Sequence, residues 1–136
     1  MKIINFEFDP DTKITKIVLA DKYGQYTGTA KLHPDDIYSH IVGGNIAEQR
    51  ALIKKCSEDI KRYRHMLKAI KDLQKDIQNN NLNIDSKIDR RFNIFIRNYS
   101  QEINFLKEDI LEIKKGIKEA LELRNKIIEK SKAKNK

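Results

Sequence analysis

The chain has 136 residues, of which 35% are charged and 39% are hydrophobic, with a formal net charge of +8 at pH 7. This length suits one domain, but so few apolar residues leave too little material for a thick globular core, so much of the buried surface should be linear. With five Gly, two Pro and no Trp, the composition favours long helices over a loop-rich enzyme fold.

The single cysteine, Cys56, excludes an internal disulfide and favours a reducing compartment. The N-terminal residues 1–7 show neither the apolar region nor the cleavage site of a secretory signal. No segment approaches the roughly 20 apolar residues that span a bilayer. We therefore expect a soluble, cytoplasmic protein without membrane contact.

Residues 1–32 predict a three-stranded antiparallel β-meander. Ile4, Phe6 and Phe8 alternate with polar residues, which is the two-residue period of a strand. Turn-forming residues follow at 9–12 and again at 21–24. A sheet of this size has one apolar face to cover, and we expect a helix to cover it.

Residues 33–44 predict a short helix that opens at His33-Pro34 and ends at Gly43-Gly44. Proline suits the first helical position, whereas each glycine costs a helix interior about 1 kcal/mol relative to alanine. A new helix should then begin at Asn45, although a kinked continuous helix is the alternative.

Residues 45–130 predict an antiparallel coiled-coil hairpin with helices at about 45–78 and 86–130, because apolar residues recur at seven-residue spacing. Residues 79–83 supply the turn, and the basic tail at 131–136 should fray. The fold class is therefore α+β, mainly α, and we expect the segments to form one structural unit. The residues predicted to form the packing seam are Ile53, Ile60, Leu67, Ile70, Phe92, Phe95, Tyr99, Ile103, Leu106 and Ile110.

The last helix carries more apolar surface than one seam needs. Ile94, Phe105 and Leu123 lie off the main stripe, and a helix that is apolar on two sides is usually packed on two sides. We expect a homodimer or higher oligomer that pairs through this helix. The alternative is that the sheet alone covers the second face.

The sequence predicts no catalytic residues, no metal site and no cofactor. His33, His40 and His65 are scattered, without a second imidazole or thiol at helical spacing. Cys56 falls on the seam, where a buried thiol is inert. We therefore expect that the protein is not an enzyme.

Basic residues form the candidate binding surface. Lys54, Lys61, Lys68 and Lys75 recur every seven residues, and an arginine cluster follows the predicted turn. Arginine holds phosphate or carboxylate in a fixed fork, whereas lysine supplies a hydrated point charge. The alternative is a solvated face that is balanced by acidic neighbours. The residues predicted to bind a partner or phosphate are Lys54, Lys61, Arg62, Lys68, Arg90, Arg91 and Arg97.

The segment Gly28-Thr29-Ala30-Lys31-Leu32-His33-Pro34-Asp35-Asp36, followed by Gly44-Asn45-Ile46-Ala47-Glu48-Gln49-Arg50-Ala51, resembles the strand-to-helix region of small uncharacterised proteins carried by phages and prophages of low-GC bacteria. The resemblance covers less than a fifth of the chain. It implies an accessory phage protein, a class rich in non-enzymatic antagonists of host defence systems.

Three functional hypotheses follow. The first is an oligomeric binding protein that inhibits or sequesters a host factor, with defence factors that handle nucleic acid or nucleotide signals among the candidate targets. The second is a nucleic-acid-binding protein that uses the basic face of the hairpin directly. The third is a structural or scaffold coiled coil.

Overall fold

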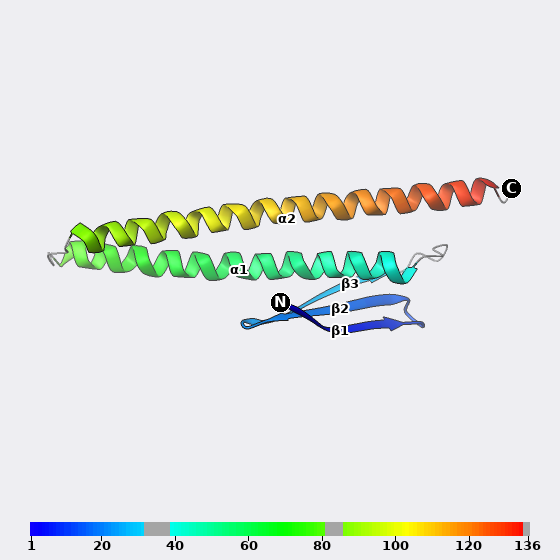
Figure 1. The fold of residues 1–136 in the computed structure, drawn as a ribbon, viewed down its shortest axis with the longest axis horizontal. Helices are drawn as coiled ribbons and strands as arrows, with labels where there is room; N and C mark the ends of the chain where they lie inside the picture. Colours follow the sequence, from blue (N-terminus) through cyan, green and yellow to red (C-terminus); the bar gives the residue numbers. More distant parts are fainter. Residues whose placement is uncertain (32–38, 81–85, 135–136) are drawn as a thin grey trace. The chain divides into compact units, whose positions relative to one another are not determined.

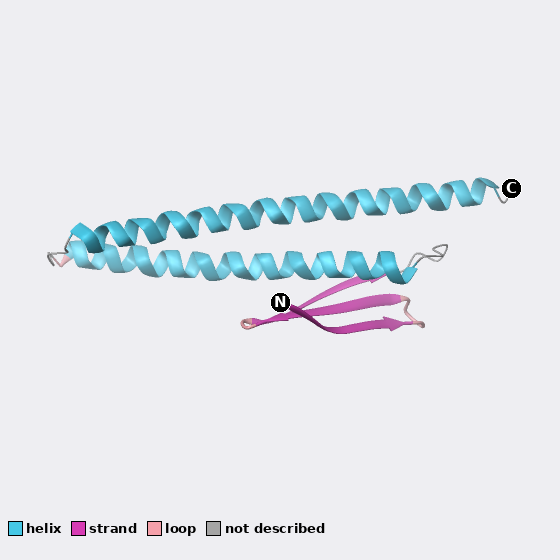
Figure 2. Ribbon diagram, viewed as in Figure 1, coloured by secondary structure: helices cyan, strands magenta, loops and turns pink. Residues whose placement is uncertain are grey.

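The computed structural model describes residues 1–31, 39–80 and 86–134. Three antiparallel strands come first in the chain and two long helices follow (Figures 1 and 2), which confirms the predicted α+β, mainly α fold. The elements are β1 Lys2–Asp9, β2 Ile14–Asp21, β3 Gly24–Lys31, α1 Ser39–Asn79 and α2 Ser86–Lys134.

The chain divides into two compact units. The expectation that its segments form one structural unit stays a prediction. The first unit, called the sheet unit here, comprises Met1–Lys55 and Ile110–Lys136. The second, the hairpin unit, comprises Cys56–Asp109. Both helices contribute to both units, because one boundary between the units falls within α1 and the other falls within α2.

The sheet has the strand order β1-β2-β3, so β2 is central and the two other strands are edges. The predicted meander is therefore confirmed. β1 pairs with β2 from Lys2 opposite Ala20 to Asp9 opposite Ile14, and the register shifts between Ile3 and Asn5. Such a shift marks a β-bulge, in which one strand inserts an extra residue.

Aspartates organise both hairpin turns of the sheet. The Asp9 carboxylate accepts hydrogen bonds from the backbone N–H of Asp11 at 2.9 Å and of Thr12 at 3.4 Å. The Asp21 carboxylate accepts from the backbone N–H of Tyr23 at 2.8 Å and from the Tyr26 hydroxyl at 3.2 Å. Each carboxylate therefore satisfies turn amides that the ladder leaves unpaired.

The N-terminal part of α1 packs directly on the sheet through small residues. A β-carbon at Gly28 would lie 1.8 Å from the carbonyl oxygen of Ala47 and 2.5 Å from the backbone nitrogen of Ala51. Ala47 and Ala51 are both 0% exposed, and they join the core cluster with residues of β2 and β3. Only a residue without a side chain permits this approach of strand and helix backbones.

The predicted break at Gly43-Gly44 does not occur, because α1 runs without interruption from Ser39 to Asn79. The sheet explains these two glycines. A β-carbon at Gly43 would lie 3.0 Å from Thr15 Oγ1, and one at Gly44 would lie 3.2 Å from Phe6 Cε2. The close packing offsets the helix cost of glycine. The predicted start of a short helix at residues 33–36 lies outside the described residues.

The ends of the hairpin helices agree with the sequence more closely. α1 ends at Asn79, where the backbone N–H and the side-chain amide of Asn80 both donate to the Asp76 carbonyl, at 3.0 Å and 2.9 Å. α2 begins at Ser86 and continues to Lys134, so residues 131–134 are helical rather than frayed. Lysine and alanine are good helix formers, which explains the extension. In the described ranges, no helix has an apolar window long enough to cross a membrane.

The first prediction tests the contact at Gly28. Gly28→Ala should lower the free energy of unfolding by about 1–3 kcal/mol, because the new methyl group collides with the backbone of α1. Gly24→Ala is the matched control in the same strand, since a β-carbon there meets nothing within 4 Å. Urea unfolding followed by circular dichroism measures both variants. Equal stability of the two variants would contradict the contact.

The second prediction concerns Asp21. Burial acts to raise the pKa of this carboxyl, but hydrogen bonds from Tyr23, Tyr26 and Gly24, together with the Lys55 charge, outweigh it and lower the pKa below its ordinary 3.8. A lowered folded-state pKa contributes stability that is present above the unfolded value and is lost as the pH falls through the folded value.

Asp21→Asn should therefore have a lower melting temperature than the wild type at pH 7, and the gap should shrink as the pH falls below about 3.8. Thermal denaturation at several pH values, followed by circular dichroism, measures the gap. Asp11→Asn, at an exposed position of the other turn, is the control. A gap that does not change with pH would show that the charge of Asp21 is irrelevant to folding.

Candidate partner-binding surface

In the hairpin unit, the two helices pack antiparallel. The Tyr63 and Tyr99 rings lie 5.6 Å apart between centroids and are tilted by 35°. Further along, the side-chain amide of Gln74 donates to Asp89 Oδ1 at 3.0 Å and to Asn93 Oδ1 at 3.3 Å. Residue numbers rise along α1 as those of the contacting residues fall along α2, which fixes the antiparallel register.

The seam of the hairpin unit is narrow. Ile60 and Ile103 are each 6% exposed, and Cys56, one helical turn before Ile60, is buried at 9%. The other predicted seam residues of this unit are half-buried, with one exception, since Phe95 is 47% exposed. The half-buried seam residues are Leu67, Ile70, Phe92, Tyr99 and Leu106, and the predicted members Ile53 and Ile110 are half-buried in the sheet unit.

The first turns of α2 carry an exposed surface of alternating arginine and apolar side chains, called the arginine–apolar patch here. Ile88, Ile94 and Phe95 are 48%, 39% and 47% exposed. Three arginines lie among them in sequence and are also exposed. Residues three and four apart are neighbours on a helix surface, so the patch forms two rows. One row contains Ile88, Arg91 and Phe95, and the other row contains Arg90, Ile94 and Arg97.

The three arginines of the patch have no ion-pair partner within the part of the chain that the structure describes. The nearest acidic residue in sequence, Asp89, is half-buried and accepts the hydrogen bond from Gln74. Phe95 is held in place from one side, because its ring stacks on Tyr99 at 6.2 Å with an interplanar angle of 16°. The patch therefore offers unused guanidinium donors around an anchored aromatic ring.

Two exposed apolar residues of α1 belong to the same unit as the patch. Leu73 is 50% exposed and Met66 is 44% exposed. Leu73 precedes Gln74, which bonds Asp89 and Asn93, so Leu73 lies at the level of the patch along the hairpin. Sequence reasoning missed Leu73 and Met66, because neither residue falls on the seven-residue pattern.

A second surface of the hairpin unit is a basic stripe along α1. Its members follow each other at steps of three and four residues, which spans about 21 Å of helix. Lys61 pairs with Glu58 at 3.1 Å, whereas the other members have no ion-pair partner among the described residues. The stripe comprises Lys61, Arg64, Lys68, Lys71 and Lys75.

The stripe differs from the predicted one. Arg62 is half-buried and pairs with Asp59, so its charge is engaged within α1. In the sheet unit, Lys55 lies 3.9 Å from Asp21, and Lys54 is exposed. The prediction did not include Arg64 and Lys71, because it rested on lysines spaced strictly seven residues apart. A helix of 3.6 residues per turn also brings the intermediate positions onto the same face.

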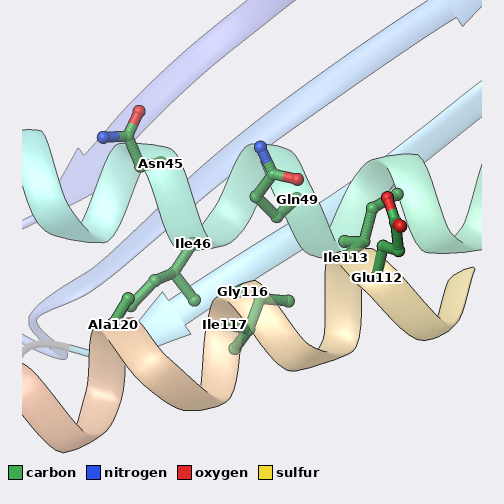
Figure 3. Close-up of a pocket in the computed structure, with 8 residues that line it drawn as sticks. All are labelled: Asn45, Ile46, Gln49, Glu112, Ile113, Gly116, Ile117 and Ala120. Atoms are coloured by element: carbon green, nitrogen blue, oxygen red, sulfur yellow. The ribbon is translucent and has the colours of Figure 1, made fainter. Parts of the chain in front are cut away.

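A groove lies between α1 and α2 within the sheet unit and has a volume of about 560 Å³. Figure 3 shows the side-chain amides of Asn45 and Gln49 directed away from α2, while aliphatic side chains such as Ile46 and Ile117 lie between the helices. Glu112 is the one ionisable residue of its lining. The groove therefore contains no pair of titratable groups for acid–base chemistry.

No group of three potential metal ligands occurs in residues 1–31, 39–80 and 86–134. The predictions that the protein lacks a metal, a cofactor and catalytic residues stay predictions.

Comparison of the chain with protein-family models, curated proteins and solved structures gives no match. The resemblance of residues 28–51 to phage and prophage proteins therefore stays a prediction. In the structure, Gly28, Ala47 and Ala51 of this segment make the contact between strand and helix, and Arg50 donates to the Thr29 carbonyl at 2.8 Å. These four residues therefore have a structural role.

Proposed function

We propose that this chain is a non-enzymatic binding protein that captures another protein and blocks it, with the arginine–apolar patch of α2 as the contact surface. One observation carries the proposal. Three arginines without an ion-pair partner among the described residues alternate with three large apolar side chains that are 39–48% exposed. Aromatic residues and arginine are enriched in the centres of protein interfaces, whereas lysine is depleted there.

The chemistry of the patch defines the partner. The arginines fit carboxylates, and the apolar side chains between them fit an apolar centre on the same partner surface. Burying the exposed parts of Ile88, Ile94 and Phe95 supplies about 1 kcal/mol each, since full burial of such a side chain gives about 1.5–3 kcal/mol. The partner should therefore present acidic residues around an apolar depression.

The patch alone is small for a stable complex, because typical interfaces bury about 800 Å² on each partner. Leu73 and Met66 of α1 supply further apolar area in the same unit. A partner that contacts both helices is therefore a better fit than one that contacts α2 alone.

The resemblance of residues 28–51 supports a class of target. Phage accessory proteins include antagonists of host defence, and the target would then be a host factor, one that handles nucleic acid or nucleotide signals among them. This role needs no catalysis, since a tight complex that covers the active site or binding site of the target is sufficient to inhibit it.

The third prediction tests the patch. The triple variant Arg90→Glu, Arg91→Glu and Arg97→Glu should lose a partner that the immobilised wild-type chain retains from a bacterial lysate, because each guanidinium is replaced by a charge that repels carboxylates. The matched control is Lys114→Glu, Lys118→Glu and Lys126→Glu, which makes the same change of charge at exposed positions of α2 in the sheet unit. Circular dichroism checks the helicity of each variant.

Mass spectrometry of the retained proteins, with and without nuclease treatment of the lysate, gives the readout. A protein that is retained by the wild type and the control in both treatments, and is lost from the arginine variant, supports the proposal. Equal retention by all three chains would show that the patch is not the contact surface.

The basic stripe of α1 favours a second function, direct binding of nucleic acid. Four of its five cations have no ion-pair partner among the described residues, and their spacing suits a polyanion that runs along the helix. Such binding works through counterion release and has little sequence preference.

The fourth prediction tests this second function. If all five cations contact phosphates, the logarithm of the duplex binding constant should fall with the logarithm of salt concentration at a slope of about −4.5, and Lys68→Gln, Lys71→Gln and Lys75→Gln together should bring the slope to about −2. Fluorescence anisotropy with labelled duplex measures both slopes. Absent or salt-independent binding would remove this function.

A further inference from the structure

The two edge strands of the sheet differ in how well they are protected from pairing with another strand. β3 carries polar side chains on the face away from the core, and the Arg50 guanidinium donates a hydrogen bond to the Thr29 carbonyl at 2.8 Å. On β1, Ile3, Ile4 and Phe6 are 53%, 49% and 51% exposed. Long edge strands with exposed apolar side chains are surfaces for strand addition.

The bulge in β1 decides which side chains share a face. Ile3 lies opposite Leu19 and Phe6 opposite Ile17, and both partners belong to the core that α1 covers. The extra residue therefore places Ile3 and Phe6 on one face although they are three positions apart. Lys2, Asn5 and Glu7 lie on the other face, where Asn5 Nδ2 donates to Glu7 Oε1 at 2.9 Å.

We propose that β1 pairs antiparallel with β1 of a second copy of this chain, about a two-fold axis between Ile4 and Asn5, and joins two sheets into one of six strands. In this register Lys2 lies opposite Glu7 of the partner subunit, and Ile3 lies opposite Phe6 of the partner subunit. The two-fold axis repeats both pairs. Each dimer therefore gains two ion pairs on one face of the sheet and two apolar pairs on the other.

Charge complementarity selects a second copy as the occupant. β1 is cationic at its start, through Lys2, and anionic towards its end, through Glu7 and Asp9. Antiparallel pairing with an identical strand brings opposite charges together at both ends. A register shifted by one residue places Lys2 opposite Phe8 or Phe6, depending on the direction, and so brings the polar and apolar faces together. A shift by two residues places Asn5 opposite Phe6 in one direction, and in the other it places Lys2 opposite Asn5 and loses the pair with Glu7. The proposed register keeps Lys2 with Glu7 on one face and Ile3 with Phe6 on the other, and it leaves the bulge residue Ile4 opposite Asn5 of the partner subunit at the two-fold axis.

This surface differs from the one that the sequence suggested for oligomerisation. Two further apolar residues of the last helix are covered within the sheet unit, since Leu121 packs against the core cluster and Ile128 is 8% exposed. The pairing through β1 is also independent of the arginine–apolar patch, so failure of one proposal leaves the other intact.

The test is a charge swap measured by sedimentation velocity on the full chain, with any purification tag at the C-terminus. The wild type should show a concentration-dependent dimer. Lys2→Glu and Glu7→Lys should each raise the dimer dissociation constant about tenfold or more, because each variant places like charges opposite each other twice in the dimer.

The double variant Lys2→Glu with Glu7→Lys should dimerise like the wild type, because both ion pairs are restored with reversed sign. An equimolar mixture of the two single variants should form a heterodimer. In that heterodimer one ion pair has the native sign and the other has the reversed sign, so no like charges face each other. This outcome identifies the register as well as the surface.

Ile3→Lys, which removes the apolar pair with Phe6 of the partner subunit, should weaken the dimer as well. Ile127→Lys is its matched control, at a position of α2 that is 55% exposed. A monomer at every concentration would overturn the proposal. A dimer that responds to none of the changes at Lys2, Ile3 and Glu7 would overturn it as well.

Discussion

The close contact between the backbones of β3 and α1 is the constraint on which the sheet unit depends. With Gly28 against Ala47 and Ala51, the helix lies on the sheet at a distance that no larger residue permits. This distance places Arg50 within hydrogen-bonding reach of the Thr29 carbonyl and brings Lys55 to 3.9 Å from Asp21. The same approach explains the two glycines of the first turns of α1, where β1 and β2 side chains meet the helix. The three glycines thus allow the helix to pack closely against the sheet around a small apolar core.

Much of the fold was predictable because the signals for it are local. Alternation of apolar residues marks a strand and a seven-residue period marks a helix pair, and neither signal requires knowledge of the rest of the chain. Gly43-Gly44 shows the limit. Their helix propensity indicates a break, but a contact with the sheet, which no local pattern records, decides that the helix continues. The extension of α2 through residues 131–134 is a different and smaller error, because the local helix propensity of lysine and alanine already favours it.

For the candidate surface, the sequence predicted the arginines, but it did not predict that Phe95 beside them is exposed. Phe95 was assigned to the seam by its spacing, yet it is half exposed and stacks on Tyr99 from outside the most buried part of the seam. A period of seven cannot distinguish a side chain in the centre of a seam from one at its margin, because the two positions differ by a fraction of a helical turn. Arg62 shows the opposite error, since a charge that looked available is engaged with Asp59.

For the binding of a partner, the arrangement of charges in the hairpin unit matters more than its net charge. Cys56–Asp109 holds eleven Lys and Arg residues against nine Asp and Glu, so the unit is close to neutral. Three of its carboxylates are engaged locally, with Lys61, Arg62 and Gln74, and this leaves cations without a partner among the described residues on both helices. The two groups of cations differ in chemistry. A lysine-rich stripe attracts polyanions with a strength that salt screens, whereas arginines among apolar side chains bind in a partly desolvated contact that salt screens less. A complex that stays bound at moderate salt concentration therefore indicates binding through the patch on α2. A complex that dissociates as the salt concentration rises indicates binding through the stripe on α1.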